Sequence, residues 1–495
     1  MELEFRRTQI PYLQCVCHET LIQEEHGETI VPDSMPDMER IVGSCAEAVL
    51  RSRACAGGEL ALAGDVQACV LYRAAGEDEP RQLSVFLPFT LRRAVPEGSC
   101  SCAVQCAVKR TEAQMLGSRR VDVRVTLLIT LRIWRSREQT CFCPAEPDRL
   151  VQLRFAEYPM RLVRECAEKP VLLRDTLPLG AGAPEPARIV FAGGRCELTE
   201  EKLSGSQAAC KGALRLSLLY QTPEGTLGGC ELSMPFSQLI DLEGSYDEQG
   251  LELLPVLTSL EVMAEGSGVS VEAGICLQCV VTQTVNVPLV EDAYALRGNL
   301  RAETQRLELQ PLLDSRTLRQ DCLLELPAQA AEILRAEALP DAPRIEWDDG
   351  LCRIRVPVAV RVLCRDARGE CRLVEGSTEL SGELPAARSA CQAEARIDGP
   401  VFAVPGGGRI ELRIPVAAQV RWYDDAPRQS ICALELTEGP REERPAVVIR
   451  TLAADAQLWD IAKELRTTVS AIQIANDMDA DMAPAGTMLL IPIVA

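Results

Sequence analysis

Long runs of alternating apolar and polar residues constrain the fold of this chain most. In residues 119–134, apolar side chains recur at every second position from Val121 to Ile133, with polar or charged residues between most of them. This period of two places the apolar side chains on one face of a strand and the polar ones on the other. Similar runs occupy residues 268–283 and 408–423. The sequence therefore predicts a mainly β protein with long antiparallel strands.

The pattern of strands returns along the chain. Each of these runs is preceded by a second alternating strand, and the three earlier strands end at Tyr72, Tyr220 and Cys364. Tyr72 and Tyr220 lie 148 residues apart, and Tyr220 and Cys364 lie 144 residues apart. Copies of this length are large enough to hold their own cores, which favours domain duplication over a short-repeat solenoid. We expect three antiparallel β-rich sandwich units, which span residues 29–140, 170–292 and 298–430.

Breaks rich in proline and glycine separate the expected units. One break covers residues 144–147 and another covers residues 180–186. Residues 437–445 combine charged residues with Gly439, Pro440 and Pro445, which is typical of a solvated linker. Residues 1–28 are expected to form an N-terminal segment outside the units. Within the units, helical character is expected only in two stretches, residues 38–50 and 329–338.

The last fifty residues, 446–495, follow a different pattern. A β-prone run at 447–452 precedes residues 458–465, in which positions 458, 461, 462 and 465 are apolar and share one face of a helix. A second helical stretch covers residues 469–476, and residues 488–492 form a short strand after a turn. This order predicts a small domain of strand, helix, helix and strand.

The C-terminal region resembles a LysM domain. The resemblance is carried by Leu458-Trp459-Asp460-Ile461-Ala462, Thr468-Val469, Ile472, Ala475-Asn476 and Leu490-Ile491-Pro492. LysM domains bind N-acetylglucosamine polymers such as peptidoglycan in a shallow groove between the loop before the first helix and the loop after the second. The resemblance implies that this groove is formed by Asp455, Gln457, Leu458, Asn476, Asp477, Met478, Met482 and Pro484.

The first loop departs from the LysM pattern. The family usually has Gly-Asp-Thr before Leu-Trp, whereas this chain has Asp455-Ala456-Gln457. Thr caps a helix by accepting a backbone hydrogen bond, and Gln is a poorer cap. This change, with the adaptable side chains of Met478 and Met482, favours a protein ligand over a glycan. Trp459 has two interpretations, which are packing in the module's core and direct contact with the ligand.

A second resemblance concerns the repeated units. Residues 31–37, Val-Pro-Asp-Ser-Met-Pro-Asp, are followed by Arg40-Ile41-Val42, and together they resemble the entry motif of the SPOCS domain. Gly64, Tyr72 and Pro88-Phe89 continue that pattern in the first unit. The second unit keeps a reduced version, and the third lacks the Pro-Phe pair. The second unit's version consists of Pro184, Pro186, Arg188-Ile189-Val190 and Pro235-Phe236.

SPOCS-like units ahead of a terminal LysM module are similar to the SipL-type spore morphogenetic proteins of endospore-forming anaerobes. That resemblance implies a non-enzymatic scaffold in the mother-cell cytoplasm, at the forespore surface within the spore coat. It also implies that the LysM module binds the ATPase of the coat's basement layer, stage IV sporulation protein A, alongside other coat proteins. The alternative is a protein that binds peptidoglycan of the cell wall or spore cortex.

Charge and hydropathy exclude other classes of partner. The formal net charge is −20, from 72 acidic and 52 basic residues. A chain of this charge is not attracted to nucleic acid or to anionic lipid by electrostatics. The longest uncharged run, residues 273–290, contains several polar residues and a proline, so no membrane span is expected. The charged N-terminus also lacks the apolar segment of a secretory signal.

The sequence predicts neither a catalytic centre nor a metal or cofactor site. Its two histidines, His18 and His26, both lie in the N-terminal segment, and none of its lysines follows a glycine as in a P-loop. The 22 cysteines include one C-x-x-C pair, Cys276 and Cys279, without the second pair that a structural zinc site requires. Reduced, packed thiols are therefore expected, and oxidative cross-linking within an assembled protein layer is the alternative.

Overall fold

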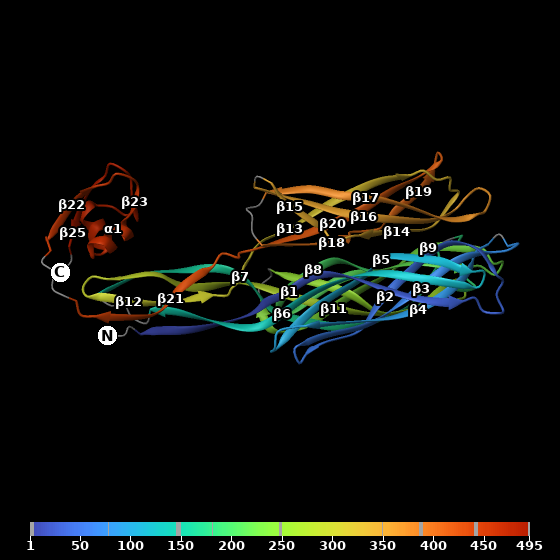
Figure 1. The fold of residues 1–495 in the computed structure, drawn as a ribbon, viewed down its shortest axis with the longest axis horizontal. Coiled ribbons are helices and arrows are strands. Elements are labelled where there is room, and N and C mark those ends of the chain that lie inside the picture. Colours follow the sequence, from blue (N-terminus) through green and yellow to red (C-terminus); the bar gives the residue numbers. More distant parts are fainter. Residues whose placement is uncertain are drawn as a thin grey trace.

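The computed structural model describes residues 4–77, 79–144, 150–180, 182–246, 250–348, 350–385, 390–439 and 444–493. Most of these residues lie in antiparallel strands, and the described part of the chain contains two short helices, both near its C-terminus. The expected mainly β class is thus confirmed. Figure 1 shows an elongated molecule, with the bulk of the strands at one end and the C-terminal module at the other.

The first unit consists of two three-stranded sheets. Its strands are β1 (Phe5–Ile30), β2 (Met38–Ala56), β3 (Glu59–Ala74), β4 (Arg81–Ala94), β5 (Cys100–Gly117) and β6 (Arg120–Pro144). The first strand pairs with the last, which also pairs with β5, and the middle strands form the meander β2-β3-β4. The alternating apolar residues of β6, from Val121 to Ile133, are fully buried between the two sheets.

The second unit repeats this order with one strand fewer. Its strands are β7 (Val151–Pro178), β8 (Arg188–Gln221), β9 (Leu227–Tyr246), β10 (Leu251–Glu265) and β11 (Gly268–Ala295). Its sheets are β10-β11-β7 and β8-β9. Strand β8 is long because it turns back at Gly205, where φ is 59°. The Thr199 hydroxyl donates to the Lys211 carbonyl at 3.2 Å, so the two halves of β8 lie together like β2 and β3.

The third unit has the same core order, and its described residues form ten strands. They are β12 (Asn299–Leu307), β13 (Leu312–Leu326), β14 (Glu332–Pro340), β15 (Arg344–Asp348), β16 (Leu351–Arg365), β17 (Cys371–Pro385), β18 (Ala390–Ile397), β19 (Phe402–Gly406), β20 (Arg409–Tyr423) and β21 (Arg428–Thr437). One sheet is β13-β20-β18 with β19 also on β20, and the other places β14, β15 and β17 on β16. Strands β12 and β21 form a separate two-stranded ribbon.

A glycine explains the Pro-Phe pair that the first two units share. Gly64 lies opposite Phe89, and Gly212 lies opposite Phe236. A Cβ at Gly64 would lie 2.4 Å from Phe89 Cζ and 2.3 Å from the Val49 carbonyl oxygen, and one at Gly212 would lie 2.9 Å from Phe236 Cζ. Each phenylalanine ring therefore fills the space beside a glycine, where no other side chain fits.

The third unit has neither the glycine nor the phenylalanine at these positions, and two aliphatic side chains pack there instead. Its equivalent positions are Val356 and Leu380, which lie opposite each other and are both fully buried. In the first unit, β2 passes beside Gly64. The corresponding strand of the third unit is divided into β14, which ends at Pro340, and β15, which begins at Arg344. The interruption leaves room for the valine side chain that the first two units exclude.

Replacing Gly64 with alanine should lower the free energy of unfolding by about 2–3 kcal/mol, because the new methyl group overlaps a backbone carbonyl and a buried ring. Urea unfolding of the full chain measures this. Gly117→Ala is the matched control, since a Cβ at Gly117 meets no atom within 4 Å. Equal midpoints for the two variants would show that the glycine is not required.

Equivalent residues of the three units meet in one apolar cluster. Leu71, Leu219 and Leu363 each directly precede the repeated position of Tyr72, Tyr220 and Cys364. All three leucines are buried together, in contact with other residues from each unit. The units therefore pack side by side around a common centre rather than in a row.

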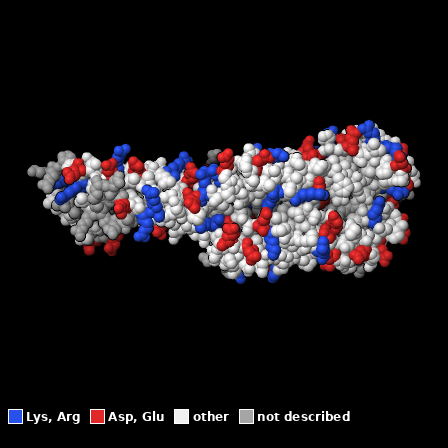
Figure 2. Space-filling model, turned by 90° about the horizontal axis from the view of Figure 1, so that it is seen from below, with Lys and Arg blue, Asp and Glu red and all other residues white. Residues whose placement is uncertain are grey.

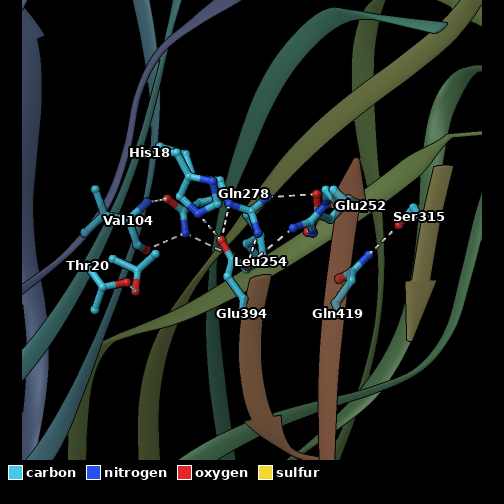
Figure 3. A network of polar contacts seen from close by, with 12 residues as sticks. His18, Thr20, Val104, Glu252, Leu254, Gln278, Ser315, Glu394 and Gln419 are labelled. Carbon is cyan, nitrogen blue, oxygen red and sulfur yellow. Dashed lines mark hydrogen bonds and ion pairs between the residues drawn. The ribbon is translucent and has the colours of Figure 1, made fainter. Parts of the chain in front are cut away.

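A buried polar network lies at a second contact among the three units (Figure 3). Arg132 of β6 contacts Glu252 of β10 at 2.8 Å and also pairs with Glu394 of β18, while Arg421 of β20 contacts both carboxylates. His18 Nε2 lies 2.8 Å from Glu394 Oε1. Burial alone would raise the pKa of Glu394, but Arg132, His18 and Arg421 hold it well below its usual range. Buried arginine and glutamate side chains from all three units thus neutralise one another at this contact.

Three strand pairs continue beyond the units and form a common stem. They are the outer parts of β1 and β6, those of β7 and β11, and the ribbon of β12 and β21. Apolar side chains from all three pairs share a core, including Ile10, Cys141, Leu162, Val287 and Leu307. In Figure 1 these pairs run from the units toward the C-terminal module.

Some expected elements are wrong. Residues 38–50 and most of residues 329–338 are not helical, because they lie in β2 and β14. Their side-chain composition permits a helix, but pairing with β3 and β16 decides the structure. Of the expected N-terminal segment, residues 1–28, residues 5–28 are not separate from the first unit, since β1 pairs with β6 along its length, and residues 1–3 lie outside the described residues. Strand β7 likewise begins upstream of residue 170.

Two predicted breaks fall partly on residues that are not described. Within the break at 144–147, residues 145–147 lie outside the described residues, and so do residues 440–443 of the linker at 437–445. The break at 180–186 separates β7 from β8, and residue 181 lies outside the described residues. Residues 494 and 495 of the C-terminal region are also outside them.

Candidate functional site

The C-terminal module is a two-stranded sheet covered by two helices. Its elements are β22 (Val447–Thr451), β23 (Ala456–Gln457), α1 (Leu458–Leu465), α2 (Val469–Asn476), β24 (Met482–Ala483) and β25 (Met488–Pro492). Strand β22 pairs with β25. Both helices and the closing strand begin and end where the sequence predicts them. The buried apolar residues of the module are Leu452, Leu458, Ile461, Ala462, Ile472, Ala483, Leu489 and Ile491.

The two loops that were expected to form a groove are held together by hydrogen bonds. Gln457 lies opposite Met482 in the short pair of β23 and β24. The Leu458 backbone N–H donates to the Asp481 carbonyl at 2.8 Å. The Asp455 carboxylate accepts a hydrogen bond from the Ala485 N–H, also at 2.8 Å. The loops therefore form one continuous edge of the module.

The first helix begins without a side-chain cap. Gln457 occupies the cap position of α1 and makes no capping hydrogen bond, whereas Thr468 accepts one from the Ala471 N–H at 3.0 Å and caps α2. The Gln457 side chain instead accepts a hydrogen bond from Arg154 of β7 at 3.1 Å. The residue that departs from the LysM pattern thus contacts the stem.

Three of the eight predicted groove residues have structural roles. Leu458 is fully buried in the module's core, so it cannot contact a ligand. Asn476 exchanges hydrogen bonds with the backbone of Leu490 at 2.7 and 2.8 Å and thereby joins α2 to β25. Met478 is half-buried against the core. The predicted residues that are exposed are Asp455, Gln457, Asp477, Met482 and Pro484.

Trp459 packs against the module's core, as one of the two interpretations from the sequence expected, and it also lies at the contact between the module and the stem. Its indole N–H donates to Asp292 of β11 at 2.8 Å, and its ring packs edge-on against Tyr294 with 4.9 Å between centroids. Lys463 pairs with the same Asp292 carboxylate at 2.7 Å. Burial raises the pKa of Asp292, but the hydrogen bonds from Lys463 and Trp459 lower it to a net value below the usual one.

A further hydrogen bond fixes the module on the stem. The Tyr294 hydroxyl donates to the carbonyl of Thr467 at 2.8 Å, at the connection between α1 and α2. Tyr294 and Leu296 belong to the same apolar cluster as the module's own core. The end of β11 therefore provides the contact surface for the module. Its residues lie more than 150 positions from their partners in the sequence.

Replacing Asp292 with alanine should release the module from the stem while both parts stay folded. The substitution removes one acceptor that serves Trp459 and Lys463, which costs about 2–3 kcal/mol of docking free energy. Hydrogen–deuterium exchange should then rise in residues 292–298. Glu303→Ala, an exposed change on the stem, is the control. Unchanged exchange in Asp292→Ala would contradict the docking contact.

The outer face of the module's sheet exposes large apolar side chains. Ile449 is 65% exposed and Met488 is 69% exposed, and Val447 and Leu490 lie beside them on the same face. Ile474 on α2 is also exposed. The sequence does not reveal this surface. Residues 488–491 are all apolar, so no alternation of apolar and polar residues distinguishes the inward-facing positions from the outward-facing ones. Single exposed apolar residues are ordinary, but a cluster of them marks an interaction surface.

The remaining chemistry is that of a packed β protein. The described residues include no group of three or more His, Cys, Asp or Glu side chains placed to hold a metal ion. All 22 cysteines are free. Burial raises the pKa of Cys106 and of Cys196 to about 12, so these thiols stay protonated and unreactive. No helix in the described ranges is long and apolar enough to cross a membrane.

The surface charges are mixed rather than segregated. On the face shown in Figure 2, basic and acidic side chains alternate along the whole length of the molecule. Many are cross-strand or neighbouring pairs, such as Arg174 with Glu272 and Arg353 with Glu383. Such exposed pairs contribute little stability.

Comparisons with known proteins found no match for this chain. No family model, no curated protein and no solved structure matches it.

Proposed function

We propose that this protein is a non-enzymatic scaffold of the spore envelope whose C-terminal module docks a protein partner at the forespore surface in the mother cell. The observation that carries the proposal is the cluster of exposed apolar side chains on the module's sheet, around Ile449 and Met488. Clusters of this kind are typical of protein interfaces. The resemblance to SipL-type proteins implies that this partner is stage IV sporulation protein A.

The loop edge of the module supports a protein ligand over a glycan. The first loop is engaged by the stem through Gln457 and Arg154, and Trp459 is covered by Tyr294. An aromatic ring in contact with the stem is not available to stack on a sugar. Met482, which is 53% exposed at this edge, offers an adaptable apolar contact to a protein instead.

The shape of the molecule supports a scaffold. The three units pack around a common centre, and the stem holds the module at the far end of the long axis (Figure 1). The contacts of Asp292 and Tyr294 attach the module to that stem. A module that is held at one end presents its free face to a second layer, while the units can contact other coat proteins.

Localisation during sporulation tests the proposal. A fluorescent fusion of the full chain should form a ring around the forespore, because the docked module recruits it to the basement layer of the coat. The same fusion with Ile449→Asp should remain dispersed in the mother cell, since a charge is placed within the apolar face. A wild-type signal that is uniform or confined to the outer wall would contradict the proposal.

A further inference from the structure

A groove separates the first unit from the second, far from the C-terminal module. Its volume is about 840 Å³, and its floor is the outer face of the sheet β2-β3-β4. The start of β8 and the second half of β10 form its walls. Grooves of this volume at the boundary between domains are typical binding sites.

One side chain that lines the groove spans the contact between the two units. Gln82 reaches across and donates a hydrogen bond to the Val190 carbonyl at 2.8 Å. Gly229 is the equivalent residue of the second unit, since Gln82 lies opposite Leu71 and Gly229 lies opposite Leu219. A Cβ at Gly229 would lie 1.7 Å from the carbonyl oxygen of Leu334 in the third unit. Backbone contact therefore closes that boundary, whereas Gln82 acts as a spacer at this one.

One wall of the groove is a free strand edge. Among the described residues, strand β10 is the last strand of its sheet and pairs with β11 alone. Residues 258–263 line the groove consecutively, which indicates that the edge of the strand faces it, because the side chains of a strand alternate between two faces. Proteins usually cover such edges or protect them with charges, and an uncovered edge is a template for an added strand.

The side chains around this edge suit an extended segment that carries apolar and basic residues. Phe86 is 68% exposed and Met263 is 64% exposed, and both line the groove. The charged lining consists of three carboxyl groups, from Glu47, Asp65 and Glu261, and one guanidinium, from Arg51, which pairs with Asp65.

Glu47 adds to this preference for a cation. Its carboxylate accepts a hydrogen bond from the Gly194 N–H at 2.8 Å. Burial and the nearby Glu337 raise the pKa of the Glu47 carboxyl, while the Gly194 hydrogen bond and Arg335 lower it, and the net pKa is about 7. A basic side chain in the groove would favour the charged form of this carboxyl.

We propose that an extended basic segment of a partner protein binds in this groove as an additional strand on the edge of β10. Its apolar side chains would contact Phe86 and Met263, and its basic side chains would lie near Glu47 and Glu261. This second docking site lies on the β-rich body, so it goes beyond the partner contact of the C-terminal module. A chain with both sites connects two different proteins.

A labelled heptapeptide that alternates lysine and valine tests this site by fluorescence anisotropy with the full chain at physiological salt. We expect saturable binding that protects residues 258–263 from hydrogen–deuterium exchange. Replacing both Phe86 and Met263 with alanine should weaken binding at least about tenfold, because these exposed side chains form the apolar contact. Phe402→Ala, at a similarly exposed phenylalanine outside the groove, should leave binding unchanged.

Two further peptides separate strand addition from attraction to an acidic protein. A central proline removes a backbone donor and should weaken binding about tenfold, and exchanging the lysines for glutamates should do the same. The Ile449→Asp variant should bind the lysine peptide normally, which distinguishes this site from the module's contact. Absence of saturable binding, equal binding by the double alanine variant, or exchange protection outside β10 would overturn the proposal.

Discussion

Replacing Arg132 with methionine should lower the free energy of unfolding by about 3–5 kcal/mol, because it removes one of the cations that neutralise two buried carboxylates. Arg132 is only 6% exposed and contacts both Glu252 and Glu394, which belong to the second and third units. Arg421, with His18 beside Glu394, then faces two negative charges in a water-poor site. Urea unfolding of the full chain measures the loss as a shift of the midpoint.

Arg413→Met is the matched control for this effect. Arg413 pairs with Asp321, but both side chains are well exposed, so the loss should stay below about 1 kcal/mol. The Arg132 substitution should also loosen the contact between units, which raises hydrogen exchange in β10 and β18. A loss for Arg132→Met that is no larger than the control's would show that the network does not join the units.

Replacing Ile449 with aspartate should weaken binding of the proposed partner, the ATPase, by at least about 2 kcal/mol, or roughly thirtyfold. The side chain is 65% exposed, so the free module should keep its stability, and the loss should arise only when the charge is buried at the interface. Biolayer interferometry of the full chain against immobilised stage IV sporulation protein A measures the change.

Two other variants identify which surface of the module binds. Leu323→Asp changes an equally exposed apolar residue on β13, 74% exposed and far from the module, and should not affect binding. Met482→Asp tests the loop edge. If Met482→Asp abolishes binding and Ile449→Asp does not, the partner docks on the loops that the LysM resemblance indicates, and the sheet face is not the contact.

Local pattern predicted many of the elements correctly, but not all of them and not all of their pairing partners. The alternation in residues 119–134 predicts β6, and the apolar spacing of residues 458–465 predicts α1 to the residue. The pattern failed at residues 38–50, where Ala46 and Ala48 suit a helix equally well. There, the pairing of β2 with β3 decides the outcome, and no local signal reports that pairing.

The contacts that position the candidate site are long-range, and the sequence does not reveal them. Asp292 and Trp459 meet only because β11 extends into the stem and the module folds back onto its end. His18 and Glu394 likewise come from the first and third units. An isolated aspartate or histidine looks like an ordinary strand residue, so these roles require the three-dimensional arrangement. The repeated Gly64 and Phe89, by contrast, are visible as a motif whose reason is the packing.

The most direct test of the central claim measures binding of the full chain to purified stage IV sporulation protein A and to purified peptidoglycan in parallel. The proposed scaffold should bind the ATPase with a dissociation constant at or below about 1 μM, as expected for a specific interface, and should not sediment with peptidoglycan. Retention by peptidoglycan without binding to the ATPase would contradict the scaffold and support a wall-binding protein instead.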